Sequence, residues 1–152
     1  YDLGGGIPNG KKLKGVIPGG ASSSVLTAAE IDVTYSFDAL AKAGTMMGSA
    51  AIMVFDEDTD AVKLLHRIVR FFSHESCGQC TPCREGTHWA RMIIRDFLDG
   101  NGNERKLKRL HRVGGNMIGT TVCALGDACG MPIQAFTTKF ADEFREVQAL
   151  AA

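Results

Sequence analysis

The chain has 152 residues, 45% of them hydrophobic, so its length and composition suit one domain or one domain and part of another. Its 17 basic residues balance 17 acidic ones, which removes the positive charge typical of proteins that bind nucleic acid or anionic membranes. Its apolar runs fall short of the roughly 20 residues that cross a bilayer. Five cysteines cannot all pair with one another, which favours a reducing compartment and cysteines that act as ligands.

The first 56 residues are rich in glycine and in strand-forming sequence, and their start at Tyr1 in a loop-like stretch suggests a piece of a longer protein. Strands are predicted in KLKGVIPGG, IDVTY and AAIMVF (residues 12–20, 31–35 and 50–55), the last of them buried. A helical turn is predicted in FDALAKAG, ending at Gly44. These segments indicate part of a small α+β unit.

Amphipathic helices are predicted in the rest of the chain. The first is capped by Thr59 or Asp60 and ends near Ser73, the second follows a cysteine cluster and stops at DGNG (99–102), and the third covers 103–113. In the fourth, Pro132 lies in the first turns and an unbroken apolar stripe follows: Ile133, Phe136, Phe140, Phe144 and Val147. Four helices with short connections imply a small bundle.

A basic run occupies the third predicted helix, in ERKLKRLHR (104–112). Such a run is usually a solvated helix face, and the neutral overall charge supports that interpretation. A docking surface for an acidic partner subunit is the alternative.

Four cysteines are spaced as ligands of one metal centre. Cys77, Cys80 and Cys83 are each separated by two residues, and Cys123 lies far downstream in the loop between the third and fourth predicted helices. A [4Fe–4S] cluster offers four iron corners and suits three clustered thiolates with one remote partner. A structural zinc site, which usually presents two separated cysteine pairs, is the main alternative. Cys129 reads as a buried small residue, and it is the substitute if Cys123 is not the fourth ligand.

Three stretches carry a family resemblance: HESCGQCTPCREG (74–86), CALGDA (123–128) and VIPGGASS (16–23). They resemble the C-terminal part of the NADH-binding flavoprotein subunit of respiratory complex I, a module shared with diaphorase subunits of NAD-linked hydrogenases and formate dehydrogenases. The resemblance covers essentially the whole chain. It implies a mostly α fold in which residues 57–152 form a four-helix bundle holding one [4Fe–4S] cluster on Cys77, Cys80, Cys83 and Cys123. Residues 1–56 would be the later portion of a ubiquitin-like β-grasp domain, which is an α+β fold.

The resemblance also implies a function, that of an electron-transfer module in an NADH:quinone oxidoreductase. Single electrons would pass from FMN through the cluster towards neighbouring subunits, and no residue of this piece would be catalytic. NADH and FMN belong to an N-terminal domain that no part of this sequence matches. The implied partners are that flavin domain, a small [2Fe–2S] subunit and a large iron–sulfur subunit, with no nucleic acid and no membrane insertion.

The implied location is the peripheral arm on the cytoplasmic side of a bacterial inner membrane, or the matrix side in mitochondria. A soluble diaphorase subunit and a zinc-stabilised interaction module are the alternative functions.

Overall fold

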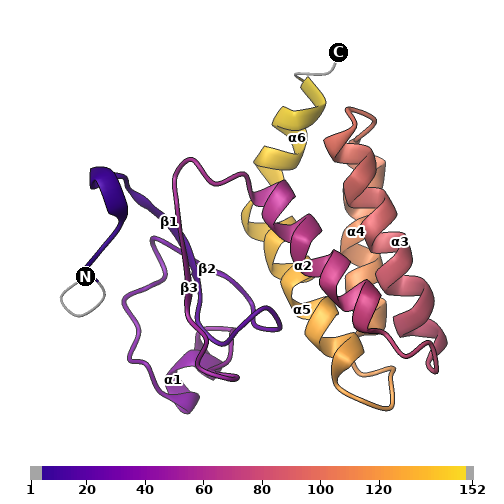
Figure 1. Cartoon of the computed structure of the whole chain (residues 1–152), viewed down its shortest axis with the longest axis horizontal. Coiled ribbons are helices and arrows are strands. Elements are labelled where there is room, and N and C mark those ends of the chain that lie inside the picture. Colours follow the sequence, from indigo (N-terminus) through magenta and orange to yellow (C-terminus); the bar gives the residue numbers. More distant parts are fainter. Residues whose placement is uncertain (1–4, 150–152) are drawn as a thin grey trace. The chain divides into compact units, whose positions relative to one another are not determined.

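A computed structural model describes residues 5–149, and it describes side chains up to residue 146. The chain divides into two compact units, residues 1–59 and residues 60–152, so residues 57–59 belong with the first unit. The described part is mostly helical, with one small antiparallel sheet in the first unit (Figure 1). None of the described helices is long and apolar enough to cross a membrane.

The first unit is built on a three-stranded sheet in the order β2-β1-β3. The central strand β1 (Leu13–Ile17) pairs antiparallel with β2 (Leu26–Thr27) and with β3 (Met53–Asp56). Helix α1 (Phe37–Lys42) is capped by the Ser36 side chain and followed by Gly44 at a φ of 76°, as predicted. A 3-10 turn, η1 (Pro8–Gly10), precedes the sheet.

Two predictions for this unit are wrong. Residues 31–35 form no strand, because local hydrogen bonds such as Val33 N to Ile31 O satisfy the backbone there, and the Tyr35 hydroxyl donates to Pro18 O over 2.7 Å. The strand predicted at 50–55 exists as β3 but is not buried on both faces. Phe55 is buried and Val54 is 53% exposed, since neighbouring strand residues point to opposite faces.

The described residues of the second unit form five helices: α2 (Ala61–Glu75), α3 (Thr81–Leu98), α4 (Glu104–Met117), α5 (Leu125–Lys139) and α6 (Ala141–Ala149). Helix α2 packs on α3 and α5, and α4 packs on α3 and α5. The side chains of Asp60 and Asn103 cap α2 and α4 by accepting hydrogen bonds from backbone N–H groups of the first turn. The interior is apolar, and in it Phe97 and Phe144 meet edge to face with ring centres 5.2 Å apart.

The fourth predicted helix is in fact two helices. Its apolar stripe is buried through Phe144, while the side chain of Val147 lies outside those described. Helix α5 ends before Phe140, whose ψ of 28° is not helical. The Thr137 and Thr138 hydroxyls donate to the carbonyl oxygens of Ile133 and Gln134, a pattern that bends helices.

Two glycines and a proline that were expected at helix ends lie inside helices. Helix α4 continues through Gly114 and Gly115, because Gly114 is buried where α4 crosses α5. Helix α5 begins at Leu125, well before the predicted position, so Pro132 lies in its interior and not in its first turns. Burial of Pro132 and its neighbour Ile133 offsets the loss of one helical hydrogen bond.

Candidate metal centre

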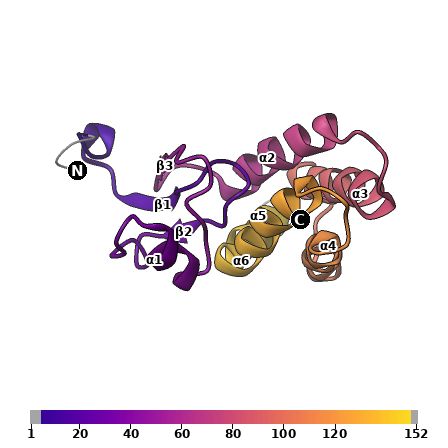
Figure 2. The same ribbon diagram turned by 90° about the horizontal axis from the view of Figure 1, so that it is seen from below.

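The cysteine-bearing loops lie at one end of the helical unit. The chain between α2 and α3 and the chain between α4 and α5 are neighbours in both views (Figures 1 and 2). In the first loop, Gly78 adopts a φ of 80°, which favours glycine and turns the chain between Cys77 and Cys80. Pro82 then fixes the start of α3, so Cys80 is the residue before the helix and Cys83 lies in its first turn.

One hydrogen bond to sulfur joins the two loops, and a second contact to sulfur lies within the first. The backbone N–H of Val122 donates to Cys80 Sγ over 3.4 Å, which brings the residue next to Cys123 against the first loop. Ser76 Oγ lies 3.3 Å from Cys83 Sγ and accepts a hydrogen bond from the Gly78 N–H at 3.4 Å. The structure therefore gathers Cys80, Cys83 and the Cys123 loop at one place.

The four predicted ligands differ in exposure. Cys83 is buried, Cys80 is half-buried, and Cys77 and Cys123 are exposed. All five cysteines are free thiols. Within the described part of the chain, no three or more His, Cys, Asp or Glu side chains converge in the geometry that would hold a metal ion. The structure thus places the loops together without drawing all four sulfur atoms to one point.

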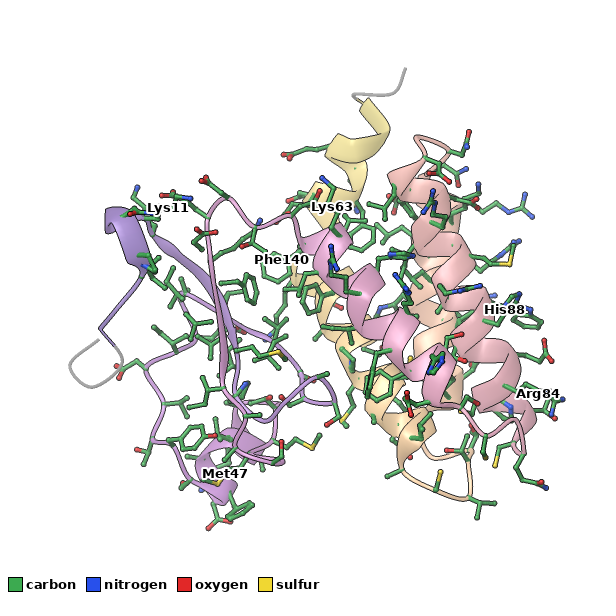
Figure 3. All side chains as sticks on the ribbon, in the orientation of Figure 1. Lys11, Met47, Lys63, Arg84, His88 and Phe140 are labelled. Atoms are coloured by element: carbon green, nitrogen blue, oxygen red, sulfur yellow. The ribbon has the colours of Figure 1, made fainter. Side chains whose placement is uncertain are left out.

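The surroundings of the loops favour negative charge. Cys80 directly precedes α3, and Cys123 precedes Ala124, the residue that caps α5, so both lie near the positive ends of helix dipoles. Arg84 donates from Nη1 to Gly78 O over 2.7 Å and from Nε to Glu85 over 3.1 Å. Figure 3 shows Arg84 at the end of α3 that follows the cysteine loop. Arg84 therefore ties the loop to the helix and adds a cation beside it.

Cys129 is set apart from the other cysteines by its burial within α5, where it has 0% exposure. Burial, helped by the nearby Cys83, raises the pKa of the Cys129 thiol to about 12. The thiol therefore stays protonated near neutral pH, whereas metal ligation requires a thiolate. This supports the interpretation of Cys129 as a core residue.

Two hydroxyl groups beside the cysteines were not anticipated from the sequence. The Ser76 hydroxyl contacts Cys83, and the Thr87 hydroxyl, on a side chain with 1% exposure, has no hydrogen-bond partner among the described residues. Thr87 lies one helical turn after Cys83. Within the sequence, only their positions could have pointed to these two hydroxyl groups, because the serine directly precedes the first cysteine and the threonine follows the third by four residues.

The donor set fits an iron–sulfur cluster in its chemistry. Four thiols are distributed over two loops and a helix turn, as four iron corners require. The Val122 N–H donates to Cys80 Sγ and the Ser76 hydroxyl lies within hydrogen-bond distance of Cys83 Sγ, and donors of these kinds stabilise the negative charge of a thiolate-bound cluster. The nearby His74 is exposed and pairs with Glu75 at 3.0 Å, so it is not counted among the candidate ligands.

Most of the chain is similar to known proteins. Residues 63–147 match the family described as "NADH-ubiquinone oxidoreductase-F iron-sulfur binding region". An NADH-quinone oxidoreductase subunit of Rhizobium meliloti (strain 1021) is 45% identical over 141 residues, covering 93% of this chain and 33% of the relative. An NADH-quinone oxidoreductase subunit of Streptomyces coelicolor is 39% identical over 145 residues, covering 95% of this chain and 32% of the relative.

Among solved structures, an NAD+-reducing [NiFe]-hydrogenase in its air-oxidized state superposes with a TM-score of 0.80 at 27% identity. That match covers 90% of this chain and 24% of the hydrogenase chain. The chain spans about a third of the curated relatives named above. The family match covers more than half of the chain, including all four predicted ligand cysteines, so the chain belongs to the NADH-ubiquinone oxidoreductase-F iron–sulfur binding region family.

Proposed function

We propose that this chain is the electron-transfer module of an NADH:quinone oxidoreductase, with one [4Fe–4S] cluster bound by Cys77, Cys80, Cys83 and Cys123. The observation that carries the proposal is the contact from Val122 to Cys80, which joins the two cysteine loops in a chain of this family. A cluster of this kind takes up and releases single electrons. Electrons would come from the FMN of an N-terminal domain, reduced there by NADH, and leave towards clusters of other subunits.

The protein's own part is to hold the cluster in a fixed place and to tune it. In this proposal α2 to α5 form a four-helix bundle that excludes water from one side of the cluster through Cys83 and the apolar interior. The first unit would be the later portion of a β-grasp domain. The partners would be a small [2Fe–2S] subunit and a large iron–sulfur subunit, in a peripheral arm on the cytoplasmic or matrix side of the membrane.

A second candidate is the diaphorase subunit of a soluble NAD-linked hydrogenase. The superposition on the NAD+-reducing hydrogenase supports it. The higher sequence identity to the NADH-quinone oxidoreductase relatives favours the first proposal. The two differ in their electron acceptor, and the identity of the co-purifying subunits distinguishes them.

Anaerobically purified chain is expected to contain about four iron atoms and about four acid-labile sulfides per polypeptide. Reduction with dithionite should produce an electron paramagnetic resonance signal, because a reduced [4Fe–4S] cluster holds an odd electron. Metal analysis and sulfide titration measure this directly. One zinc per chain without sulfide would instead identify a zinc-stabilised structural module.

Replacing Ser76 by alanine is expected to lower the reduction potential of the cluster. The Ser76 oxygen accepts from Gly78, so its own proton is free to bond the Cys83 thiolate, and that bond is stronger when the cluster carries more negative charge. At the wild-type midpoint, the ratio of reduced to oxidised cluster should fall about threefold or more, given the usual strength of hydrogen bonds to charged groups.

A potentiometric titration followed by electron paramagnetic resonance measures the shift, with Ser76→Thr as the control that keeps the hydroxyl. Equal potentials in wild type and Ser76→Ala, with the cluster intact in both, would show that Ser76 does not tune it.

A further inference from the structure

A groove of about 480 Å³ lies between α2 and α3, away from the cysteine loops. Helix α2 contributes His66 and Arg70, and helix α3 contributes Arg91, Met92, Arg95 and Asp96. On each helix two of these nitrogen-bearing side chains are four residues apart, which is about one turn, or 6 Å along the axis. The groove therefore presents cationic and neutral nitrogen donors from two neighbouring helices.

The charges of the groove are only partly compensated within the chain. Arg95 Nε donates to both carboxylate oxygens of Asp99 at 2.9 and 3.0 Å, and Asp96 pairs with Lys106 at 2.8 Å. Arg70 and Arg91 are exposed, and their side chains form no hydrogen bond or ion pair within the described part of the chain. The guanidinium groups of Arg70 and Arg91 are thus available to bind another molecule.

The histidine of the groove is affected by burial and, to a lesser extent, by the positive charge around it. Its half-burial and the nearby guanidinium groups of Arg95, Arg70, Arg91 and Arg67 lower the pKa of His66. A field strong enough to disfavour a further proton also attracts anions.

We propose that this groove is a docking site for an acidic segment of another protein, whose Asp or Glu carboxylates pair with Arg70 and Arg91. Bidentate pairing with a carboxylate is among the strongest interactions available to an arginine at a surface. Met92 lines the same groove and is 54% exposed, and the combination of methionine and arginine is typical of protein interfaces. The docking proposal stands apart from the cluster, because it uses neither cysteine loop.

Two other assignments fit the structure less well. A free phosphate ion offers no partner for the exposed methionine. The basic run on α4 lines two hollows, one on α4 alone and one shared with α5 and α6, and Glu104, which lines both, is engaged there with Lys108 and Arg145. The groove between α2 and α3 combines unpaired guanidinium groups with the exposed Met92, and among the described residues no exposed methionine lines either hollow of the α4 run.

The test uses the 152-residue chain and a fluorescein-labelled peptide of about 14 residues, four helical turns, in which glutamates repeat at i and i+4 among alanines and leucines. A peptide with glutamine in place of glutamate is the probe control. Fluorescence anisotropy at low salt gives the affinity. The groove variants are Arg70→Glu with Arg91→Glu and, as a milder pair, Arg70→Gln with Arg91→Gln. The matched control is Arg105→Glu with Arg109→Glu, two arginines one turn apart on α4.

Both groove pairs are expected to weaken binding of the acidic peptide by about tenfold or more, while the α4 pair changes it less than about twofold. Circular dichroism and melting temperature verify that each variant is folded. The proposal is overturned if wild type fails to bind, if the glutamine peptide binds as well, or if the α4 pair weakens binding as much as the groove pairs. Displacement by millimolar phosphate beyond that by chloride of equal ionic strength would also overturn it, in favour of a small-anion site.

Discussion

Cys123→Ser is expected to abolish the iron–sulfur cluster, with iron and acid-labile sulfide falling to background and the visible charge-transfer absorption lost. Three thiolates from the first loop can hold three iron corners, and the fourth corner then lacks its ligand. Cys123 is exposed beside the contact from Val122 to Cys80, whereas Cys129 is buried within α5 as a protonated thiol, so Cys129 is not expected to replace it. Iron and sulfide analysis of anaerobically purified variant measures the result.

Cys129→Ser is the matched control, since it makes the same substitution in the same part of the chain. This variant should keep the cluster and lose about 1–3 kcal/mol of stability, because it places a hydroxyl in an apolar site. The reverse pattern, with the cluster retained in Cys123→Ser and lost in Cys129→Ser, would make Cys129 the fourth ligand. Thermal unfolding of both variants separates loss of the cluster from loss of the fold.

The helices could be predicted because the residues buried on one face of a helix recur every three or four positions in the sequence. In α2 the apolar residues Val62, Leu65, Val69 and Phe72, spaced three and four positions apart, are all buried. The spacing of buried residues does not show where a helix is interrupted, because Phe140 at the break and Phe144 after it are both buried. The hydroxyl hydrogen bonds of Thr137 and Thr138, just before the break, leave no periodic pattern in the sequence.

The candidate site could also be predicted only in part from the sequence. The spacing of the cysteines singled out two loops, and the structure places those loops together. The groups that bond the sulfur atoms could not be identified from spacing, because one is a backbone N–H and the other is the hydroxyl of an ordinary serine. The bond from Arg84 to Gly78 O likewise depends on the fold of the loop and leaves no pattern in the sequence.

Gly114→Ala is expected to destabilise the helical unit by about 1–3 kcal/mol, as overpacking of a filled core does. A Cβ atom at Gly114 would lie 2.7 Å from Ile133 Cγ2 and 3.3 Å from Gly130 O, so α4 and α5 would have to separate. The two helices lead into the loop that carries Cys123, so their separation also displaces that loop. Gly114→Val should therefore reduce cluster content as well as stability. Chemical denaturation and iron analysis measure the two effects.

The neighbouring glycine supplies the control for this argument. At Gly115 a Cβ atom would meet only the end of the Gln134 side chain, at 3.3 Å, and Gly115 is exposed within α4. Gly115→Ala is therefore expected to stabilise the unit by up to about 1 kcal/mol through helix propensity, with cluster content unchanged. Opposite signs at adjacent residues would locate the constraint at the helix crossing. A loss of stability of similar size at both positions would show instead that α4 needs the flexibility of glycine here, and that its close approach to α5 does not position the cysteine loop.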